Sequence, residues 1–490
     1  MTVQKPSGVN KISMGYPLPG SSKLYPLSAK IWKKVVSPKM FGYFLKKFVM
    51  SNLPNTAYQI LQAALEAVKP DLLLRKKIQR RGNVLSIGEF SWDLDTYRHV
   101  YVIGAGKASA FMAKEMENIL GDRLFYGQVI VKYGYSLPCR KIRITEAGHP
   151  IVDENSLEAT NQILQFVQGA GSQDLVFCLL SGGGSSLLEK LPAGISLTDL
   201  QETQRLLLSS GATIEEVNCV RKHLSLVKGG QLSRAIAPAS CVNLILSDVI
   251  DDPLESIASG PTVSDSSTFQ MAWDIIEKYQ LKDKLPPAIR SHLENGISGI
   301  VSETLKPDHP IFKKVYSIII GNNLEALLAA KAKARELGFH TLILSSRIQG
   351  EAREVAKVIS AVVKEIIYNN FPVAKPACLL LGGETTVTVR GKGKGGRNQE
   401  LALAALQAMG ETTADYVILS SGTDGTDGST DAAGGIVFPD IWMTARQKNL
   451  DIQLFLDHND SYTFLEQIGG LIKTGPTGTN VMDLILALVQ

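Results

Sequence analysis

The chain has 490 residues, of which 44% are hydrophobic and 20% charged, and it contains 43 glycines. This length predicts two domains, and the composition excludes a disordered or fibrous protein. The formal net charge is +4, but the first 65 residues hold nine lysines and no Asp, Glu or Arg, so the remainder is weakly acidic and disfavours nucleic acid as a partner. No apolar run approaches the roughly 18 residues needed to cross a bilayer, which excludes an integral membrane protein.

The amino-terminal residues 1–54 form a basic extension rich in Lys, Ser, Gly and Pro, with one amphipathic piece at 31–50. Such an acid-poor segment resembles a mitochondrial targeting sequence, but those sequences usually carry Arg, and Arg75 is the first arginine here. The five cysteines include no C-x-x-C pair and no histidine at metal-binding spacing, which indicates a reducing compartment. We therefore expect a cytoplasmic protein, with the mitochondrial matrix as the alternative.

After the extension, apolar runs alternate with helical patterns, and the runs end in small or polar residues. Four such runs are Val100–Ile103 before G-A-G-K (104–107), Gln128–Val131 before Lys132, Leu175–Leu180 before S-G-G-G-S-S (181–186), and Val242–Leu246 before Ser247-Asp248. This alternation predicts a parallel, doubly wound, Rossmann-like α/β sheet with the site at the carboxyl ends of its strands.

Residues 295–309 show little periodicity and are the best candidate for a domain boundary. The pattern then restarts at Val315–Ile320, before Gly321-Asn322-Asn323, and continues with Thr341–Leu344, Ala377–Leu381, the alternating stretch Thr386–Val389, and Val417–Leu419. We predict a first α/β domain at 55–300 and a second at 301–490.

The loop at 391–400, G-K-G-K-G-G-R-N-Q-E, carries Lys392, Lys394 and Arg397 just before a helical run. Its glycines would let the backbone close around an anion, and the helix that follows would offer unpaired N–H groups. The alternative is a solvated turn whose lysines keep it soluble. Because other glycine loops are expected at the same sheet edges, we favour a phosphate grip, with Arg397 as the residue at the helix start.

The S-G-G-G-S-S loop is the stronger signal in the first domain, because three consecutive glycines indicate a close approach of backbone to ligand. The G-A-G-K loop resembles a dinucleotide fingerprint, but Ser109 occupies the third glycine position, and Lys132 stands where an NAD site needs an acid. Lys107 would hold a carboxylate or phosphate at a helix start, unless it only caps a turn.

Acidic residues follow several of the same strands, including Asp248, Glu384 and Asp424. Carboxylates beside phosphate-binding glycines are what a magnesium–nucleotide complex needs. Any one of them alone is more often a turn or helix cap.

Together these motifs resemble those of the class II glycerate kinases, two-domain enzymes whose carboxyl-terminal part is called the MOFRL domain. The motifs are V-I-G-A-G-K-A (102–108), S-G-G-G-S-S, V-R-K-H-L-S-L-V-K-G-G (220–230), S-D-V with I-A-S-G-P-T (247–262), G-G-R-N-Q-E-L-A-L (395–403), S-G-T-D-G-T-D-G (421–428) and G-T-N-V-M-D (478–483). The similarity covers nearly everything after residue 55, and H-N-D-S-Y-T-F (458–464) looks most like the animal members. Ser186 and Asp251 depart from the family pattern, which has Ala and Gly there.

The resemblance implies ATP-dependent phosphorylation of D-glycerate at its 2-hydroxyl, giving 2-phosphoglycerate and ADP, with Mg²⁺ and an active site in the cleft between the domains. It also implies a MOFRL region at about 377–485 and two catalytic residues, Lys107 and Arg397. For phosphate or nucleotide we predict Gly104, Gly106, Ser181, Gly182, Gly183, Gly184, Ser185, Asn322, Gly395 and Gly396. For substrate or metal we predict Asp248, Glu384, Asp424 and Asn480, with Asp248 as the best candidate for the metal.

Two other functions stay open: an NAD(P)-dependent hydroxypyruvate reductase and a non-catalytic sugar-phosphate-binding module. The expected partners are the small molecules D-glycerate and ATP, without nucleic acid or membrane, and a homodimer is possible.

Overall fold

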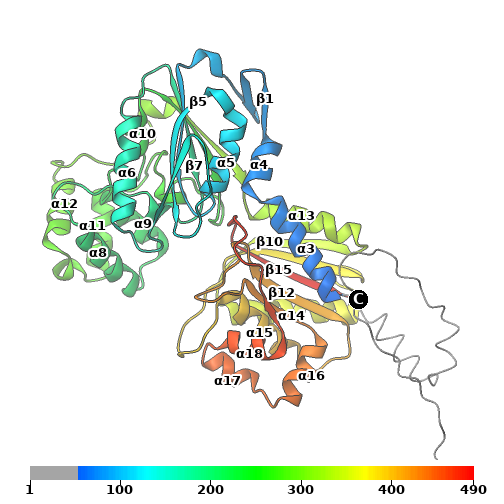
Figure 1. Ribbon diagram of the computed structural model, residues 1–490. Helices are drawn as coiled ribbons and strands as arrows, with labels where there is room; N and C mark the ends of the chain where they lie inside the picture. Colours follow the sequence, from blue (N-terminus) through cyan, green and yellow to red (C-terminus); the bar gives the residue numbers. More distant parts are fainter. Residues whose placement is uncertain (1–52) are drawn as a thin grey trace, which may run out of the picture. The chain divides into compact units, whose positions relative to one another are not determined.

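The computed structural model describes residues 53–490 (Figure 1), so almost all of the predicted extension, with its amphipathic piece, lies outside the described residues. The described strands form two six-stranded sheets and one three-stranded sheet, the latter made of β1 (Ile78–Arg81), β2 (Val84–Ile87) and β3 (Phe90–Asp93). Between residues 53 and 490, no helix has the length and apolar character needed to cross a bilayer.

The first six-stranded sheet is parallel throughout, with strand order β6-β5-β4-β7-β8-β9. Its strands are β4 (His99–Ala105), β5 (Leu124–Lys132), β6 (Ile142–Ala147), β7 (Asp174–Leu180), β8 (Ser240–Leu246) and β9 (Val315–Gly321). β7 is buried along its whole length, as expected of a strand that is covered on both faces. The predicted parallel, doubly wound sheet is confirmed.

Helices cover both faces of this sheet. Val102 shares a core with buried residues of α5 (Ser109–Leu120), whereas its neighbour Ile103 shares a different core with α6 (Glu154–Val167). Successive residues of a strand point to opposite faces, so α5 and α6 lie on opposite sides of the sheet (Figure 1).

The strand order places a topological switch point between β4 and β7. From β4 the chain moves outward through β5 to β6, and it then returns to pair β7 with the other side of β4. Connections that diverge from two neighbouring parallel strands leave a crevice at their carboxyl ends. The G-A-G-K and S-G-G-G-S-S loops follow these two strands, so both lie at the crevice.

A separate helical group, which the sequence analysis does not predict, packs around its own apolar core. It contains α8 (Leu197–Ser209), α9 (Ile214–His223), α11 (Phe269–Lys278) and α12 (Pro287–Ile297) (Figure 1).

The second six-stranded sheet has strand order β10-β11-β15-β12-β13-β14. Among its neighbouring pairs only β10 and β11 are parallel, and the others are antiparallel. Its strands are β10 (His340–Ile348), β11 (Ala377–Gly383), β12 (Tyr416–Gly422), β13 (Gly434–Val437), β14 (Leu471–Ile472) and β15 (Asp483–Val489). One face packs on α14 (Ala352–Asn369) and α15 (Arg397–Met409), and the other on α3 (Leu53–Ala67) and α13 (Asn323–Glu336). The predicted second α/β domain is therefore α/β with a mixed sheet.

Two segments join a different sheet from the one that their sequence position suggests. The strand expected to open the second domain, β9, pairs with β8 in the first sheet. Conversely, α3 comes from the predicted first domain but packs against α13 and β15 (Figure 1). Hydrophobic periodicity gives the type of an element and not its partner, so the limits 55–300 and 301–490 stay a prediction and do not coincide with the limits of the sheets.

The alternating stretch Thr386–Val389 is not a strand. Its single ladder contact is an isolated bridge between Glu351 and Thr386. Alternation alone cannot supply a neighbouring strand, and β11 already ends at Gly383.

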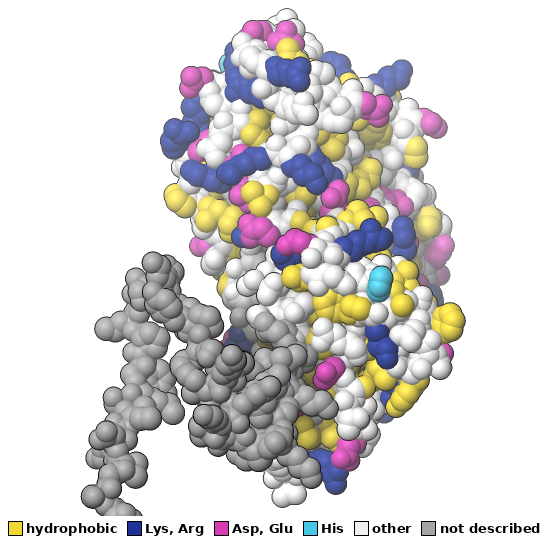
Figure 2. Space-filling view, turned by 90° about the vertical axis from the view of Figure 1, so that its right-hand side faces the viewer, with side chains coloured by type: hydrophobic (Ala, Val, Ile, Leu, Met, Phe, Trp, Pro, Cys, Tyr) yellow, Lys and Arg dark blue, Asp and Glu magenta, His cyan; other side chains and the backbone are white. Residues whose placement is uncertain are grey.

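Basic and acidic side chains are interspersed over the face shown in Figure 2. On this face, the described residues form no broad basic field of the kind that nucleic-acid binding uses.

Candidate active site

The loops that follow β4 and β7 pack against each other through their backbones. The Lys107 N–H donates to the carbonyl of Gly182 at 2.8 Å. Gly106 has a φ of +144°, and a Cβ there would lie 2.1 Å from Ser181 Oγ. A Cβ on Gly104 would lie equally close, 2.1 Å from a backbone oxygen of β7. Both glycines are needed for this close approach of the loops, and phosphate binding by them stays a prediction.

The two predicted phosphate-binding serines have partners inside the protein. Ser181 is fully buried, and its hydroxyl accepts a hydrogen bond from the N–H of Ala108 at 3.1 Å. The Ser185 hydroxyl is hydrogen-bonded to the hydroxyl of Ser259. Between them, Gly184 opens the short helix α7 (Gly184–Leu187). These contacts position the loop and the start of α5; binding of phosphate by the serines and Gly184 stays a prediction.

Polar side chains from three other segments converge on the glycines of the second loop. A Cβ on Gly182 would lie 1.9 Å from Asp248 Oδ2 and 2.5 Å from Asn480 Nδ2. Gly183 has a φ of +85°, and a Cβ there would lie 2.8 Å from the His149 ring. The glycines therefore make room for polar groups that gather at the crevice, in addition to any ligand.

Asp248 follows β8 and is the carboxylate nearest to this loop. Asn480 Nδ2 donates to its Oδ2 at 2.8 Å. Burial raises the pKa of Asp248 to about 6, while the positive charge of Lys107 lowers it and the negative charge of Asp424 raises it further. A carboxylate with this pKa is largely ionised at neutral pH and can accept a proton.

Lys107 forms an ion pair with a residue that follows β12, in the second sheet. Its Nζ lies 3.1 Å from Asp424 Oδ2, and the two side chains are 18% and 15% exposed. The N–H and hydroxyl of Thr426 donate to the other oxygen of Asp424 and hold the carboxylate in place. The pair therefore joins the glycine loop after β4 of the first sheet to the one after β12 of the second.

Arg397 is the first residue of α15 and is held by two carboxylates. Its Nε and Nη2 donate to Asp483 at 2.6 and 2.9 Å, and its Nη1 lies 3.0 Å from Glu384 Oε1. Burial lowers the pKa of Arg397, but the hydrogen bonds and charge of Asp483 and the charge of Glu384 outweigh it and raise the pKa above its usual value.

The carboxylate of Glu384 is acted on both by the charges around Arg397 and by those around Lys107. Burial raises the pKa of Glu384 above its usual value, whereas the charges of Arg397 and Lys107 lower it and those of Asp483 and Asp248 raise it. Charges influence one another over short distances. The charges of Arg397, Lys107 and Asp248 therefore all act on this carboxylate, which Arg397 contacts directly.

The glycines of the 391–400 loop serve packing against residues 458–461. A Cβ on Gly391 would lie 2.2 Å from the carbonyl oxygen of His458, and one on Gly395 would lie 2.3 Å from Ser461 Oγ. Loop N–H groups are also engaged, because Asn459 Oδ1 accepts from Arg390 and Gly391. The loop is thus a docked segment and not a free turn.

The positive end of α15 is capped by a buried carboxylate. Asp427 accepts hydrogen bonds from the N–H groups of Asn398 at 3.2 Å and Gln399 at 2.9 Å, and a Cβ on Gly396 would lie 2.3 Å from its carboxyl carbon. Burial raises the pKa of Asp427 to about 6, against the lowering effect of these two amides. Two of the N–H groups that we expected to grip an anion are therefore occupied, and phosphate binding by Gly395 and Gly396 stays a prediction.

A cavity of about 480 Å³ opens beside Arg397. Its lining includes Glu384, Val387, Gly395, Gly396, Arg397, Glu400, Asp427 and Asn459.

Asn322 has two structural partners. Its side-chain oxygen accepts from the N–H of Glu325 and caps α13, and its Nδ2 donates to Asp252 at 2.6 Å. Within residues 53–490 it has no hydrogen bond to Lys107 or Arg397. Its predicted role in nucleotide binding stays a prediction.

Comparison with known proteins gives two family matches along the chain. Residues 56–294 match the family described as "Domain of unknown function (DUF4147)", and residues 377–483 match the MOFRL family. A D-glycerate 2-kinase of Thermotoga maritima is 42% identical over 443 residues, which cover 90% of this chain and all of that protein. The chain belongs to the glycerate 2-kinase family.

Other members of the glycerate 2-kinase family span most of the chain as well. A glycerate kinase of Danio rerio is 36% identical, over 90% of this chain and 98% of its own length. The crystal structure of the glycerate kinase of Thermotoga maritima superposes with a TM-score of 0.78, over 89% of this chain and 99% of that one, at 40% identity. One similar protein of Agrobacterium vitis, 42% identical over 79% of this chain, has the provisional name of a hydroxypyruvate reductase.

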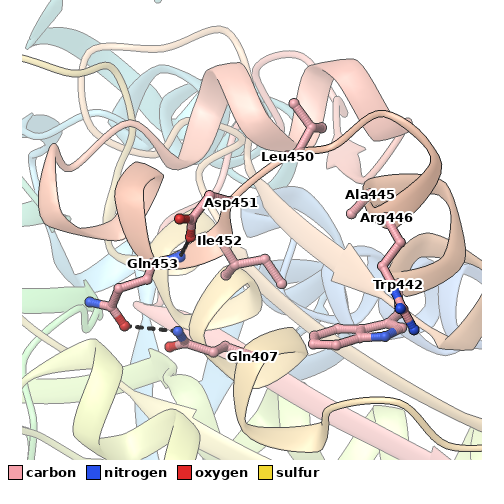
Figure 3. Close-up of a pocket in the computed structure, with 8 residues that line it drawn as sticks. All are labelled: Gln407, Trp442, Ala445, Arg446, Leu450, Asp451, Ile452 and Gln453. Atoms are coloured by element: carbon pink, nitrogen blue, oxygen red, sulfur yellow. Dashed lines mark hydrogen bonds between the residues drawn. The ribbon is translucent and has the colours of Figure 1, made fainter.

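A second cavity, of about 290 Å³, has a different lining (Figure 3). It is lined by α15, by Trp442 and Arg446 of α16 (Pro439–Gln447), and by residues up to Gln453 in α17 (Ile452–Asp457). Gln407 and Gln453 are hydrogen-bonded across it at 2.8 Å. None of the predicted catalytic or phosphate-binding residues lines it, so we do not assign it to the active site.

Three residues of the site are missing from the sequence prediction. Asp483, the bidentate partner of Arg397, begins β15 and is the last residue of G-T-N-V-M-D, which was a usable signal. His149 lies against Gly183. Burial and then the charge of Lys107 lower the pKa of His149 to about 4, so its ring is neutral. Tyr135 is the third: burial and then the charge of Asp424 raise the pKa of its hydroxyl, against the charge of Lys107.

Proposed function

We propose that the chain transfers the γ-phosphoryl group of ATP to the 2-hydroxyl of D-glycerate, forming 2-phosphoglycerate and ADP. The observation that carries this proposal is the ion pair of Lys107 with Asp424, which joins the glycine loops of the two sheets. The charges of Arg397, Asp248 and Lys107 all act on the pKa of Glu384, which supports it. Two cations drawn from different sheets suit the dispersed negative charge of a transferring phosphoryl group. Membership of the glycerate 2-kinase family supports the acceptor.

In this reaction Asp248 accepts the proton of the 2-hydroxyl. The freed oxygen bonds to the γ-phosphorus, and the bond from that phosphorus to the bridging oxygen breaks, so that ADP leaves. Lys107 and Arg397 stabilise the equatorial oxygens of the transferring group. Before this, both cations must exchange part of their carboxylate contacts for phosphate oxygens.

The residues present fit a magnesium ion. Asp248 and Asp424 offer the carboxylate oxygens that Mg²⁺ prefers, although Asn480 Nδ2 and Lys107 Nζ now contact one oxygen of each. We propose that Asp424 would help to hold Mg²⁺, which would supply charge neutralisation for the nucleotide phosphates, while Asp248 keeps its role as general base; Asp248 as a metal ligand stays a prediction from the sequence. The glycines of the crevice loops would face those phosphates.

One coupled assay tests the proposed function. The purified chain is incubated with D-glycerate and MgATP, and the phosphorylated position is identified by ³¹P NMR. Formation of 2-phosphoglycerate and ADP is expected. Formation of 3-phosphoglycerate would overturn the predicted acceptor position, and absence of any phosphoglycerate would overturn the kinase.

The second candidate is a hydroxypyruvate reductase, which is favoured only by the provisional name of the Agrobacterium vitis relative. It requires oxidation of NADH or NADPH with hydroxypyruvate, which absorbance at 340 nm follows. We expect no such oxidation of NADH, because β5 ends in Lys132 where an NAD site needs an acid, and none with either cofactor because Ser109 occupies the third glycine position of the dinucleotide fingerprint. The homodimer and the cytoplasmic or mitochondrial location stay predictions.

A further inference from the structure

Arg221 is a half-buried cation without a counter-ion. It lies near the end of α9, and its guanidinium forms no hydrogen bond or ion pair with the residues from 53 to 490. Its Nε is shut off from solvent and has no partner. Burial lowers the pKa of Arg221, but an arginine side chain does not lose its proton in proteins. A charge in this position is unfavourable unless an anion joins it.

Two basic residues near Arg221, the adjacent Lys222 and Lys228, are paired. Lys222 Nζ lies 3.0 Å from Asp265 Oδ1, and Lys228 Nζ lies 2.5 Å from Glu189 Oε2. The second oxygen of Glu189 accepts from the backbone N–H of the next residue. Glu189, whose charge raises the pKa of Arg221 against the effect of burial, therefore has both of its oxygens engaged elsewhere, and the guanidinium has no direct partner among residues 53–490.

The face of α9 that carries Arg221 turns toward the S-G-G-G-S-S loop. Asn218 lies one turn before Arg221 on the same face of the helix. Its Oδ1 accepts from the hydroxyl of Ser259 at 3.3 Å, and Ser259 is hydrogen-bonded to Ser185 of the loop. The unpartnered cation thus lies on the side of the helical group that borders the crevice.

We propose that the guanidinium of Arg221 binds the carboxylate of the acceptor and so selects hydroxy acids over neutral polyols. This inference rests on the proposed function. The acceptor D-glycerate carries one carboxylate, and the two catalytic cations, Lys107 and Arg397, are assigned to the phosphoryl group. A planar guanidinium can bind a carboxylate through two parallel hydrogen bonds. Phosphate oxygens share this chemistry, so the test must separate the acceptor from the nucleotide.

The test compares Arg221→Gln and Arg221→Lys with Arg205→Gln, a control on α8 whose exposed guanidinium pairs with Glu202. We expect Arg221→Gln to raise KM for D-glycerate by about 10- to 100-fold, the range of a lost hydrogen-bonded charge pair, with KM for ATP within about twofold. Arg221→Lys falls between, because lysine binds as a point charge. With glycerol, which lacks the carboxylate, the variants and the wild type should have equal rates.

Binding without turnover provides the independent readout. D-Glycerate alone should raise the melting temperature of the wild type and of Arg205→Gln, but not of Arg221→Gln. The ligand-free melting temperature of Arg221→Gln should not fall, because the substitution removes an unpaired charge.

Each of the remaining outcomes overturns the carboxylate site, the proposed function, or both. An unchanged KM for D-glycerate in both variants overturns the carboxylate site, and a rise confined to KM for ATP overturns it in favour of a nucleotide phosphate. If the wild type does not phosphorylate D-glycerate but is stabilised by it through Arg221, the proposed function fails and the carboxylate site stands. If D-glycerate is neither phosphorylated nor bound, both fail.

Discussion

Asp248 lies between the amide of Asn480 and the charge of Lys107 at the carboxyl end of β8. Its pKa of about 6 makes a pH dependence testable. As the general base it must be ionised, so kcat/KM for D-glycerate should fall tenfold per pH unit below about pH 6. Asp248→Asn should lower kcat by about 10²- to 10⁴-fold and remove this acid limb.

Asp251→Asn is the matched control for this change. It alters an exposed carboxylate in the same loop that pairs with Arg347, so its pH profile of kcat/KM should equal that of the wild type.

The pH dependence of stability gives a second test of the raised pKa of Asp248. The folded state raises the pKa of Asp248 and so binds its proton more tightly than the unfolded chain does, which means that stability falls as pH rises from about 4 to about 6. The free energy of unfolding of Asp248→Asn should lack this fall. If urea unfolding at several pH values shows the same fall in the variant and the wild type, the raised pKa of Asp248 is contradicted.

The sequence predicts which polar residues lie in the loops after the strands, but it does not predict which other residues they contact. The sequence places Lys107 and Asp424 in glycine loops after apolar runs and Arg397 at the start of a helix, and they lie there in the structure, while their roles stay predictions. It misses the Asp483 contact of Arg397, because that pair joins residues 86 positions apart through strand pairing. It also ascribes the glycines to ligand approach, whereas Gly106 packs against another loop of the protein.

At the scale of elements, Gly183 and Gly194 form a matched pair. Their φ angles are +85° and +86°, but a Cβ on Gly183 would meet the His149 ring at 2.8 Å, and one on Gly194 would meet nothing within 4 Å. Gly194→Ala should cost about 1–2 kcal/mol of backbone strain and leave kinetics unchanged. Gly183→Ala should also displace the site and lower kcat/KM by on the order of 10²-fold. Equal kinetics for the two variants would contradict the convergence of side chains on this loop.

The cap of α15 predicts a separate effect on stability. Asp427→Ala removes the acceptor of two backbone N–H groups and should reduce the free energy of unfolding by about 1–2 kcal/mol in urea titrations. Asp440→Ala, in the exposed first turn of α16, is the control and should change it by less than about 0.5 kcal/mol. A loss as small as the control's would show that Asp427 does not stabilise the helix start.

Hydrophobic periodicity predicts most strands of the two large sheets and the longer helices that cover them, but it does not predict how the strands pair. The apolar run at the carboxyl terminus becomes β15, which lies antiparallel between β11 and β12 and turns the second sheet into a mixed one. A buried strand of either direction has the same apolar pattern, so the sequence offers no signal for this insertion. The helical group around α9 is missed for a related reason, since its core forms among its own helices.

At the scale of the whole molecule, the central claim is that residues of two sheets act on one phosphoryl group. Lys107 follows β4 of the first sheet, and Arg397 begins α15, which packs on the second. Groups that act on the same transition state lose their effects together and not independently. If Lys107 and Arg397 act on one phosphoryl group, substitutions of the two residues should therefore have coupled effects on the rate.

A double-mutant cycle in single-turnover phosphoryl transfer tests this most directly. Lys107→Met and Arg397→Met should each lower the rate of 2-phosphoglycerate formation by about 10³-fold, with the exposed Lys392→Met as an unaffected control. We predict that the double variant is slower than the worse single variant by less than about tenfold. Losses that multiply in the double variant, or near-normal turnover in either single variant, would contradict the account.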